Sequence, residues 1–179
     1  MSPRTRRSSL GLSRCNKGLG KTDCLCCPFV TSRPNEVIKS VKIFNTGQII
    51  KIDQEINCKT KGGFLYLLWS EKCPEKQYLG SCLREPRDRL GQHRRDILNV
   101  KEGAVPEHFR KTNSKVRDLV FVPFRILKNN DTMTLKDQEY NFIKEFKLVK
   151  SGINRINGQR YFKNYRNQWK IIEFILYIC

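Results

Sequence analysis

The feature that most constrains how this chain can fold is a continuous apolar run, FLYLLWS, at residues 64–70. A run of this length and composition predicts a β-strand that is buried on both faces. A second short strand is predicted at residues 77–82, QYLGSC, and the short connection EKCPEK predicts that the two strands form an antiparallel pair. Tyr66 and Tyr78 should then lie close together near the middle of a small sheet.

The remaining segments predict helices and strands around this pair. Residues 37–53 contain two β-branched runs that flank NTG, which predicts a hairpin. Residues 117–127 predict a third strand, in which Pro123 indicates a sheet edge or a bulge. Helices are predicted at residues 86–98 and 132–146, with a short helix or turn at VPEHFRK. We therefore expect an α+β fold, a small three-stranded, mostly antiparallel sheet flanked by helices with a basic N-terminal tail.

Both ends of the chain differ in composition from this central part. Residues 1–36 are rich in Ser, Arg, Gly and Pro without apolar periodicity, which predicts a disordered basic tail that contains cysteines. Residues 37–156 should form the folded domain, and residues 157–179 a basic and aromatic C-terminal extension. The apolar stretch near the C-terminus is too short to cross a bilayer and contains Glu173, so no membrane partner is expected.

The chain is strongly basic, with 35 Lys and Arg residues, 17 Asp and Glu residues and a formal charge of +18. A surplus distributed along the chain suits a polyanionic partner, of which nucleic acid is the first choice and an anionic membrane surface the rival. The candidates for DNA binding are arginines on the outer side of the first helix and basic residues of the C-terminal extension, namely Arg87, Arg94, Arg95, Lys163 and Arg166.

Helical spacing separates two residues of the first helix from this outer group. Leu90 and Ile97 are seven residues apart and define the inward face of the helix. His93 lies on that face, and Arg89, four residues earlier, is its neighbour. In the later helix, Glu139 lies in the middle of an apolar stripe. A carboxylate there costs several kcal/mol unless it is paired, bound to a metal or placed at a cleft edge.

The eight cysteines suggest a metal site, because the N-terminus has no secretory signal and a reducing compartment disfavours disulfides. We expect the nucleus, or otherwise the cytoplasm. Cys24 and Cys27 have the two-residue gap that lets two thiolates bind one Zn²⁺. Cys58 and Cys73 downstream are the candidates for the other two ligands. The alternative is that all of these thiols are unliganded.

Taken in order, these residues resemble the GIY-YIG nuclease domain, and most closely the version in Penelope-like retroelements. The similarity covers residues 45–156. FLYLLWS is similar to the first tyrosine motif and YLG to the second, so Tyr66, Tyr78 and Gly80 match. Arg89 matches the catalytic arginine of the family, and His93 matches a histidine of the retroelement domains. Further along, Glu139 matches the metal-binding glutamate and Asn154 the terminal asparagine.

The chain also departs from the family pattern. Phe64 and Leu65 replace the first two letters of the first motif, and Ser70 replaces one of a pair of cysteines. Cys82 and Pro86 replace the usual Thr and Leu, and Gln138 stands where an Arg is common. Pro86 bears most on function, because it begins the helix that aims Arg89.

The resemblance implies a metal-dependent endonuclease that nicks DNA and leaves a 3′ hydroxyl for a reverse transcriptase domain of the parent element. Glu139 would hold Mg²⁺ or Mn²⁺, and Arg89 would contact the nonbridging phosphate oxygens. Tyr66 and Tyr78 would orient the attacking water. Either Tyr78 or His93 would be the general base, and Asn154 would fix the local geometry. The alternatives are an inactive nucleic-acid-binding remnant and a zinc-stabilised interaction module.

Overall fold

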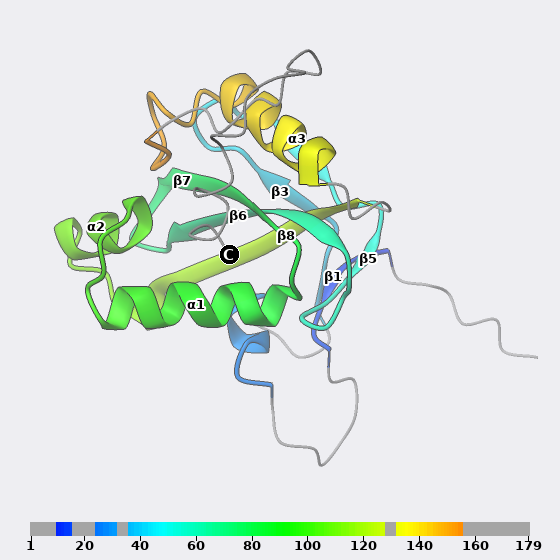
Figure 1. The fold of residues 1–179 in the computed structure, drawn as a ribbon, viewed down its shortest axis with the longest axis horizontal. Coiled ribbons are helices and arrows are strands. Elements are labelled where there is room, and N and C mark those ends of the chain that lie inside the picture. The colour runs from blue at the N-terminus through cyan, green and yellow to red at the C-terminus, as the bar shows by residue number, and fades with distance from the viewer. Residues whose placement is uncertain (1–9, 16–23, 32–35, 128–131, 156–179) are drawn as a thin grey trace, which may run out of the picture.

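The computed structural model describes residues 10–15, 24–31, 36–127 and 132–155. These residues form an α+β fold in which a central antiparallel sheet is flanked by helices, as predicted (Figure 1). The proposed C-terminal extension, with Lys163 and Arg166, lies outside the described residues. Within the described residues, no helix is long and apolar enough to span a membrane.

The central sheet has the strand order β7-β6-β8. Its strands are β6 (Gly63–Ser70), β7 (Cys73–Cys82) and β8 (Leu119–Leu127). The apolar strand β6 lies between the other two, and all of its residues except Trp69 are buried. The predicted pairing of β6 with β7 is confirmed, but β7 begins earlier than predicted. Pairing continues to Ser70 and Cys73, so only two residues remain for the turn.

Strand β8 accommodates Pro123 in the two ways that the sequence suggested. The strand is at an edge of the sheet, and its register against β6 shifts between Leu65 and Tyr66, where Pro123 is the partner of Tyr66. Proline cannot donate a backbone hydrogen bond, so an edge position next to a bulge costs the ladder little.

Short strands form two further sheets. The predicted hairpin is confirmed by the antiparallel pair β3 (Ser40–Lys42) and β4 (Ile49–Lys51), whose connection contains Gly47 at φ +74°. The other sheet has the order β2-β1-β5, in which β1 is antiparallel to β2 and parallel to β5. The bounds of these strands are Gly11–Ser13 for β1, Val37–Ile38 for β2 and Glu55–Ile56 for β5.

The prediction that residues 1–36 form a disordered tail is wrong for residues 10–15 and 24–31, which the structure describes. Residues 10–15 contain β1, and residues 24–31 contain the 3₁₀ helix η1 (Cys27–Phe29). Leu12, Cys27 and Val30 are buried and belong to the same apolar cluster as the central sheet. The composition misled because a segment with few apolar residues can still pack when those few side chains all reach one core.

Helices α1 (Pro86–Leu98), α2 (Ala104–Lys111) and α3 (Thr132–Glu145) confirm the predicted helical segments. A second 3₁₀ helix, η2 (Val116–Asp118), precedes β8. Figure 1 shows α1 and α3 on two sides of the central sheet. Tyr66 contacts α1, whereas a Cβ atom on Gly63 would meet Leu135 of α3. Odd and even positions of β6 thus face different helices.

Candidate functional site

Four of the predicted site residues form one group between β6, β7 and α1. Tyr66 is fully buried, and its hydroxyl accepts a hydrogen bond from Nε of Arg89 at 2.9 Å. The same hydroxyl lies 2.8 Å from Nε2 of His93. The ring of Tyr78 lies next to both aromatic rings, with centroids 6.3 Å from Tyr66 and 6.1 Å from His93. The inward face of α1 therefore meets the two tyrosines, as the spacing predicted.

The charges of this group follow from its hydrogen bonds and its burial. Arginine only donates, so Tyr66 accepts from Arg89, whereas the direction of the Tyr66–His93 hydrogen bond is set by the tautomer of the imidazole ring. Burial, and then the positive charge of Arg89, lower the pKa of His93 to about 3. Burial also raises the pKa of Tyr66 well above its usual value, against the opposing charge of Arg89. At neutral pH the group is a neutral imidazole, a neutral phenol and one guanidinium ion.

The space for this group depends on Gly80, the direct cross-strand partner of Tyr66. A Cβ atom at position 80 would lie 2.5 Å from the Tyr66 hydroxyl oxygen and 2.9 Å from Cε1 of Tyr78. Real Cβ atoms do not approach so closely. The glycine of the second motif is thus required by contact between the two tyrosines rather than by backbone conformation.

Tyr78 differs from its neighbours because it is only half-buried. Burial, and then the negative charge of Glu139, raises its pKa, while the charge of Arg89 and a hydrogen bond from it act in the other direction. Tyr66 and His93 are 0% and 6% exposed, so Tyr78 is the member of this group that solvent reaches most readily.

Two residues that the sequence did not single out complete the surroundings of Arg89. Nη1 of Arg89 donates to Oε1 of Gln92 at 3.0 Å, and Nη2 of Arg84 donates to the same oxygen at 2.9 Å. Gln92 follows Arg89 by three residues, so helical spacing could have indicated it. Two guanidinium groups therefore meet at one neutral acceptor, which an anionic oxygen could replace.

Asn154 forms hydrogen bonds with the backbone of β7. Its side-chain oxygen accepts the Leu79 N–H at 2.9 Å, and its side-chain nitrogen donates to the Leu79 carbonyl at 2.8 Å. Ile153 N–H donates to the Gln77 carbonyl at 2.9 Å. Strand β7 is an edge strand, so this segment pairs backbone groups that the sheet leaves open.

Glu139 is buried in α3 and has partners. The hydroxyl of Ser81 donates to its Oε2 at 2.5 Å, and Nζ of Lys136 lies 2.8 Å from the same atom. The pairing with lysine explains how a carboxylate is tolerated among apolar side chains. The hydrogen bond from Ser81 places this carboxylate against β7, and its negative charge contributes to the raised pKa of Tyr78. The Glu139 carboxylate and the Ser81 hydroxyl offer oxygen ligands, which suit a hard cation such as Mg²⁺. Nζ of Lys136 would have to move away from Oε2 for the cation to bind there.

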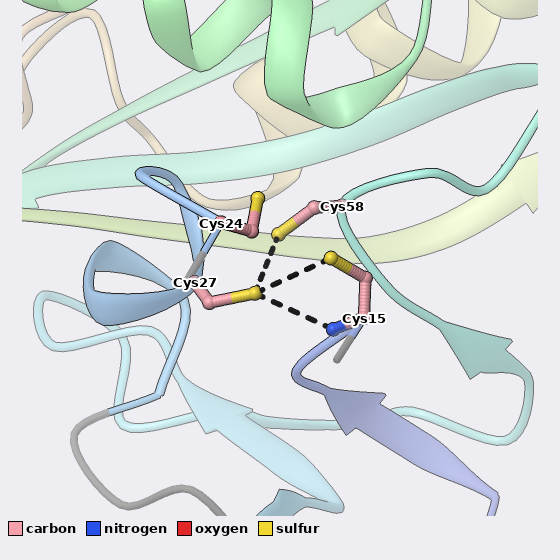
Figure 2. A group of neighbouring side chains, drawn as sticks. All are labelled: Cys15, Cys24, Cys27 and Cys58. Atoms are coloured by element: carbon pink, nitrogen blue, oxygen red, sulfur yellow. Dashed lines mark hydrogen bonds between the residues drawn. The ribbon is translucent and has the colours of Figure 1, made fainter. Parts of the chain in front are cut away.

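Four cysteines gather in a second cluster, away from the tyrosine group. Their sulfur atoms all lie within 4.8 Å of one another, and they belong to Cys15, Cys24, Cys27 and Cys58 (Figure 2). Sγ of Cys27 lies 3.5 Å from Sγ of Cys15 and 3.6 Å from Sγ of Cys58, and it accepts the Cys15 N–H at 3.4 Å. Such a cluster can hold a metal ion.

The cluster corrects one of the predicted zinc ligands. Cys73 lies in β7 and does not belong to the cluster, whereas Cys15 does. Cys15 follows directly after Arg14 at the end of β1, and the pairing of β1 with β5 carries it toward Cys58. No local spacing indicates this, because Cys15 and Cys58 are brought together by a parallel strand pair.

The crowding of thiols affects their acidity. Burial, followed by the neighbouring thiols, raises the pKa of Cys15 to about 12. Burial and Cys27 likewise raise the pKa of Cys58 above its usual value, whereas backbone hydrogen bonds help to lower that of Cys24. The four sulfur atoms lie close together, so thiolates formed there would repel one another. Deprotonation of several of these thiols is therefore unfavourable unless a cation is bound.

The predicted DNA-binding arginines of α1 differ in their surroundings. Arg95 is exposed, and Arg87 is exposed and paired with Glu85 at 2.7 Å. Arg94 was expected to point outward, but its guanidinium lies 4.8 Å from the ring centroid of Phe29 in η1. The cause is the N-terminal segment, which packs beside α1 and was not expected to be folded.

No protein-family model matches the chain, and no match was found among curated proteins or solved structures. The resemblance to GIY-YIG nucleases therefore stays a prediction that rests on the residues and on their arrangement.

Proposed function

We propose that this chain is a metal-dependent DNA endonuclease that nicks phosphodiester bonds, with a GIY-YIG-type site of the kind found in Penelope-like retroelements. The observation that carries the proposal is the buried guanidinium of Arg89, held by Tyr66 next to His93 and a half-buried Tyr78. Arg89 is only 8% exposed, and its planar guanidinium offers several N–H donors in the geometry that suits phosphate oxygens.

Arg89 would bind the scissile phosphate. Its Nη1 donates to Gln92, which also takes a hydrogen bond from Arg84. A nonbridging phosphate oxygen in place of the Gln92 carbonyl would meet both guanidinium groups. Charge on the five-coordinate phosphorus would then be stabilised by donors that are already oriented, which is the largest contribution in most hydrolytic sites.

Tyr78 is the residue that we assign to the attacking water. Its side chain is half-buried, whereas Tyr66 and His93 are buried and form a hydrogen bond with each other. The Tyr66 hydroxyl would keep Arg89 in position and His93 would keep that hydroxyl oriented. The geometry thus supports Tyr78 as the group that contacts the attacking water. It does not choose between Tyr78 and His93 as the general base, which the sequence also left open.

Glu139 would hold a divalent cation. Bound Mg²⁺ or Mn²⁺ would supply a Lewis acid for the phosphate and for the leaving 3′ oxygen. Ser81 orients the Glu139 carboxylate, and Lys136 balances its charge until it is displaced. Asn154 would serve as a positioning residue, because it holds the backbone of β7 next to Tyr78.

Nicking of supercoiled plasmid in Mg²⁺ or Mn²⁺ tests the proposal. Arg89→Ala and Glu139→Gln should each lower the rate by about a hundredfold or more. Arg117→Ala is the control, because Arg117 is an exposed arginine of η2 outside the proposed site and its loss should change the rate only slightly. Each variant should remain folded at the assay temperature, which a cooperative unfolding transition above that temperature shows.

Two outcomes would contradict the proposal. Wild-type protein that binds DNA without cutting it would favour the inactive nucleic-acid-binding remnant. Nicking that survives both Arg89→Ala and Glu139→Gln would show that neither residue is needed, and that the activity has another source, such as a contaminating nuclease.

We also propose that the cysteine cluster binds Zn²⁺. At a Zn–S distance of about 2.3 Å, tetrahedral geometry places sulfur atoms about 3.8 Å apart. Two Sγ pairs are 3.5 and 3.6 Å apart, and both include Cys27. A disulfide requires about 2 Å and could join Cys27 to only one of these partners. The hydrogen bond from the Cys15 N–H to Cys27 would stabilise a bound thiolate.

Metal analysis of purified protein tests the zinc site. One equivalent of zinc is expected in the wild type and in Cys73→Ser, and loss of zinc is expected in Cys15→Ser. The reverse pattern, with zinc dependent on Cys73 and not on Cys15, would show that the cluster is not the site.

A further inference from the structure

The cysteine cluster touches the beginning of α1. The carbonyl of Cys58 accepts the Arg87 N–H at 3.0 Å, and the thiol of Cys26, next to the cluster in sequence, donates to the Arg87 carbonyl at 3.6 Å. Arg87 lies in the first helical turn, where backbone N–H groups lack partners within the helix. The residue before the helix, Glu85, makes no side-chain hydrogen bond that would cap it. The Cys58 carbonyl therefore caps α1, because it accepts a hydrogen bond from a backbone N–H group of the first turn.

A second contact lies two turns further along the helix. The guanidinium of Arg94 packs 4.8 Å from the ring centroid of Phe29, and Phe29 belongs to the 3₁₀ helix that begins at Cys27. Arg87 and Arg94 are seven residues apart and lie on the same side of α1. The N-terminal cysteine segment thus contacts this one side at two points.

Arg89 lies between these two contacts in sequence, on the inward side that meets Tyr66. A rotation or shift of α1 that broke either contact would also move Arg89 and His93 relative to the strands. Within α1 itself, nothing on the first turn replaces the Cys58 carbonyl as the partner of the Arg87 N–H.

We propose that the metal-loaded cluster of Cys15, Cys24, Cys27 and Cys58 is a strut that caps α1 and sets its position, so that Arg89 is held at the site where it would bind phosphate. The consequence for catalysis rests on the proposed nuclease function. The structural consequence, that metal binding orders the first turn of α1, rests on the proposed zinc site alone and does not depend on nuclease activity.

Hydrogen–deuterium exchange of the full chain tests the strut directly. Zinc-loaded wild type is compared with Cys15→Ser, and Cys73→Ser is the matched control because Cys73 is a half-buried cysteine outside the cluster. In Cys15→Ser, amides at residues 87–89 should exchange about tenfold faster or more, because local opening of the helix start becomes easier. Amides of β6 should exchange as in wild type, and Cys73→Ser should match wild type throughout.

Three results would overturn the strut. Cys15→Ser could retain zinc, or it could lose zinc while exchange at residues 87–89 stays unchanged. Exchange could also increase equally in β6, in which case the metal holds the whole fold and has no particular link to α1.

Phe29→Ala tests the second contact without touching a metal ligand. This variant should keep its zinc and should exchange faster around Arg94, whereas unchanged exchange there would overturn the two-point contact. Nicking rates measured on the same samples separate the two proposals. If wild type never nicks, the nuclease function fails while the exchange results still decide the strut.

Discussion

Gly80 sets how closely the two tyrosines can approach. Its hydrogen atoms occupy space in which a Cβ atom would lie 2.5 Å from the Tyr66 hydroxyl oxygen. In Gly80→Ala, Tyr66 must move away from Arg89, so we expect the free energy of unfolding to fall by about 1–3 kcal/mol, the usual cost of overpacking. Urea denaturation measures this, and nicking should fall with it.

Gly91→Ala is the control for that substitution. Gly91 lies in α1, and an added Cβ would meet only Nη1 of Arg95 at 3.5 Å, an ordinary contact. Alanine favours a helix over glycine by about 0.5–1 kcal/mol, so this variant should be as stable as wild type or more so. Equal losses in both variants would mean that Gly80 is not special.

The lowered pKa of buried His93 predicts how the free energy of unfolding depends on pH. Its pKa is about 3 in the folded protein because of burial and the charge of Arg89, and its usual value is 6.5. The unfolded state therefore binds a proton first as the pH falls. The contribution of neutral His93 to stability is complete above pH 6.5 and is lost progressively between pH 6.5 and 3.

The comparison of wild type with His93→Gln isolates this effect from the titration of carboxylates. Glutamine keeps an acceptor for the Tyr66 hydroxyl but does not titrate. The free energy of unfolding should fall less steeply from pH 7 to pH 4 in the variant. Parallel curves for the two proteins would refute the buried neutral imidazole.

For individual residues, the sequence predicted which helix face a residue lies on better than it predicted which side chain the residue pairs with. Helical spacing placed Arg89 and His93 on the inward side of α1, where both are buried. It predicted that a buried Glu139 needs a charged partner, a metal ion or a cleft edge, but not that the partner is Lys136. The choice among several lysines depends on which side chains can reach, and this is a tertiary property.

At the scale of elements, the exposed edge of β7 makes Asn154 a structural residue. Asn154→Ala would remove both hydrogen bonds to the Leu79 backbone. We expect a loss of about 1–3 kcal/mol, since the Leu79 groups lose partners in a buried setting. Thermal or urea unfolding measures it, with Asn141→Ala on the exposed side of α3 as the control. A loss no larger than that of the control would show that the clamp contributes little.

Element boundaries were predicted where the local pattern is strong. Helix α1 covers residues 86–98 as expected, because Pro86 suits the first turn and the apolar spacing continues to its end. Strand β7 was predicted too short, because Cys73 and the three residues after it carry no apolar alternation. Of these four residues, Cys73 is the one with a register partner in β6.

At the scale of the whole molecule, the formal charge of +18 predicts how DNA binding responds to salt. Each phosphate that a basic residue neutralises releases counterions, so the logarithm of affinity should fall linearly with the logarithm of salt concentration. Fluorescence anisotropy with a labelled duplex measures the slope. Arg95→Ala should reduce the slope by about one phosphate contact. Affinity that is insensitive to salt would contradict backbone binding.

The sequence by itself determined the α+β class, the β6 and β7 pair, and the face of α1 that carries Arg89 and His93. These follow from periodicity and short connections, which are local properties of the chain. Only the tertiary structure decided that Cys15 joins Cys27 and Cys58, and that part of the predicted N-terminal tail packs beside α1. The physical reason is that these contacts join segments far apart in sequence, and their energy comes from burial in a shared core that no local pattern encodes.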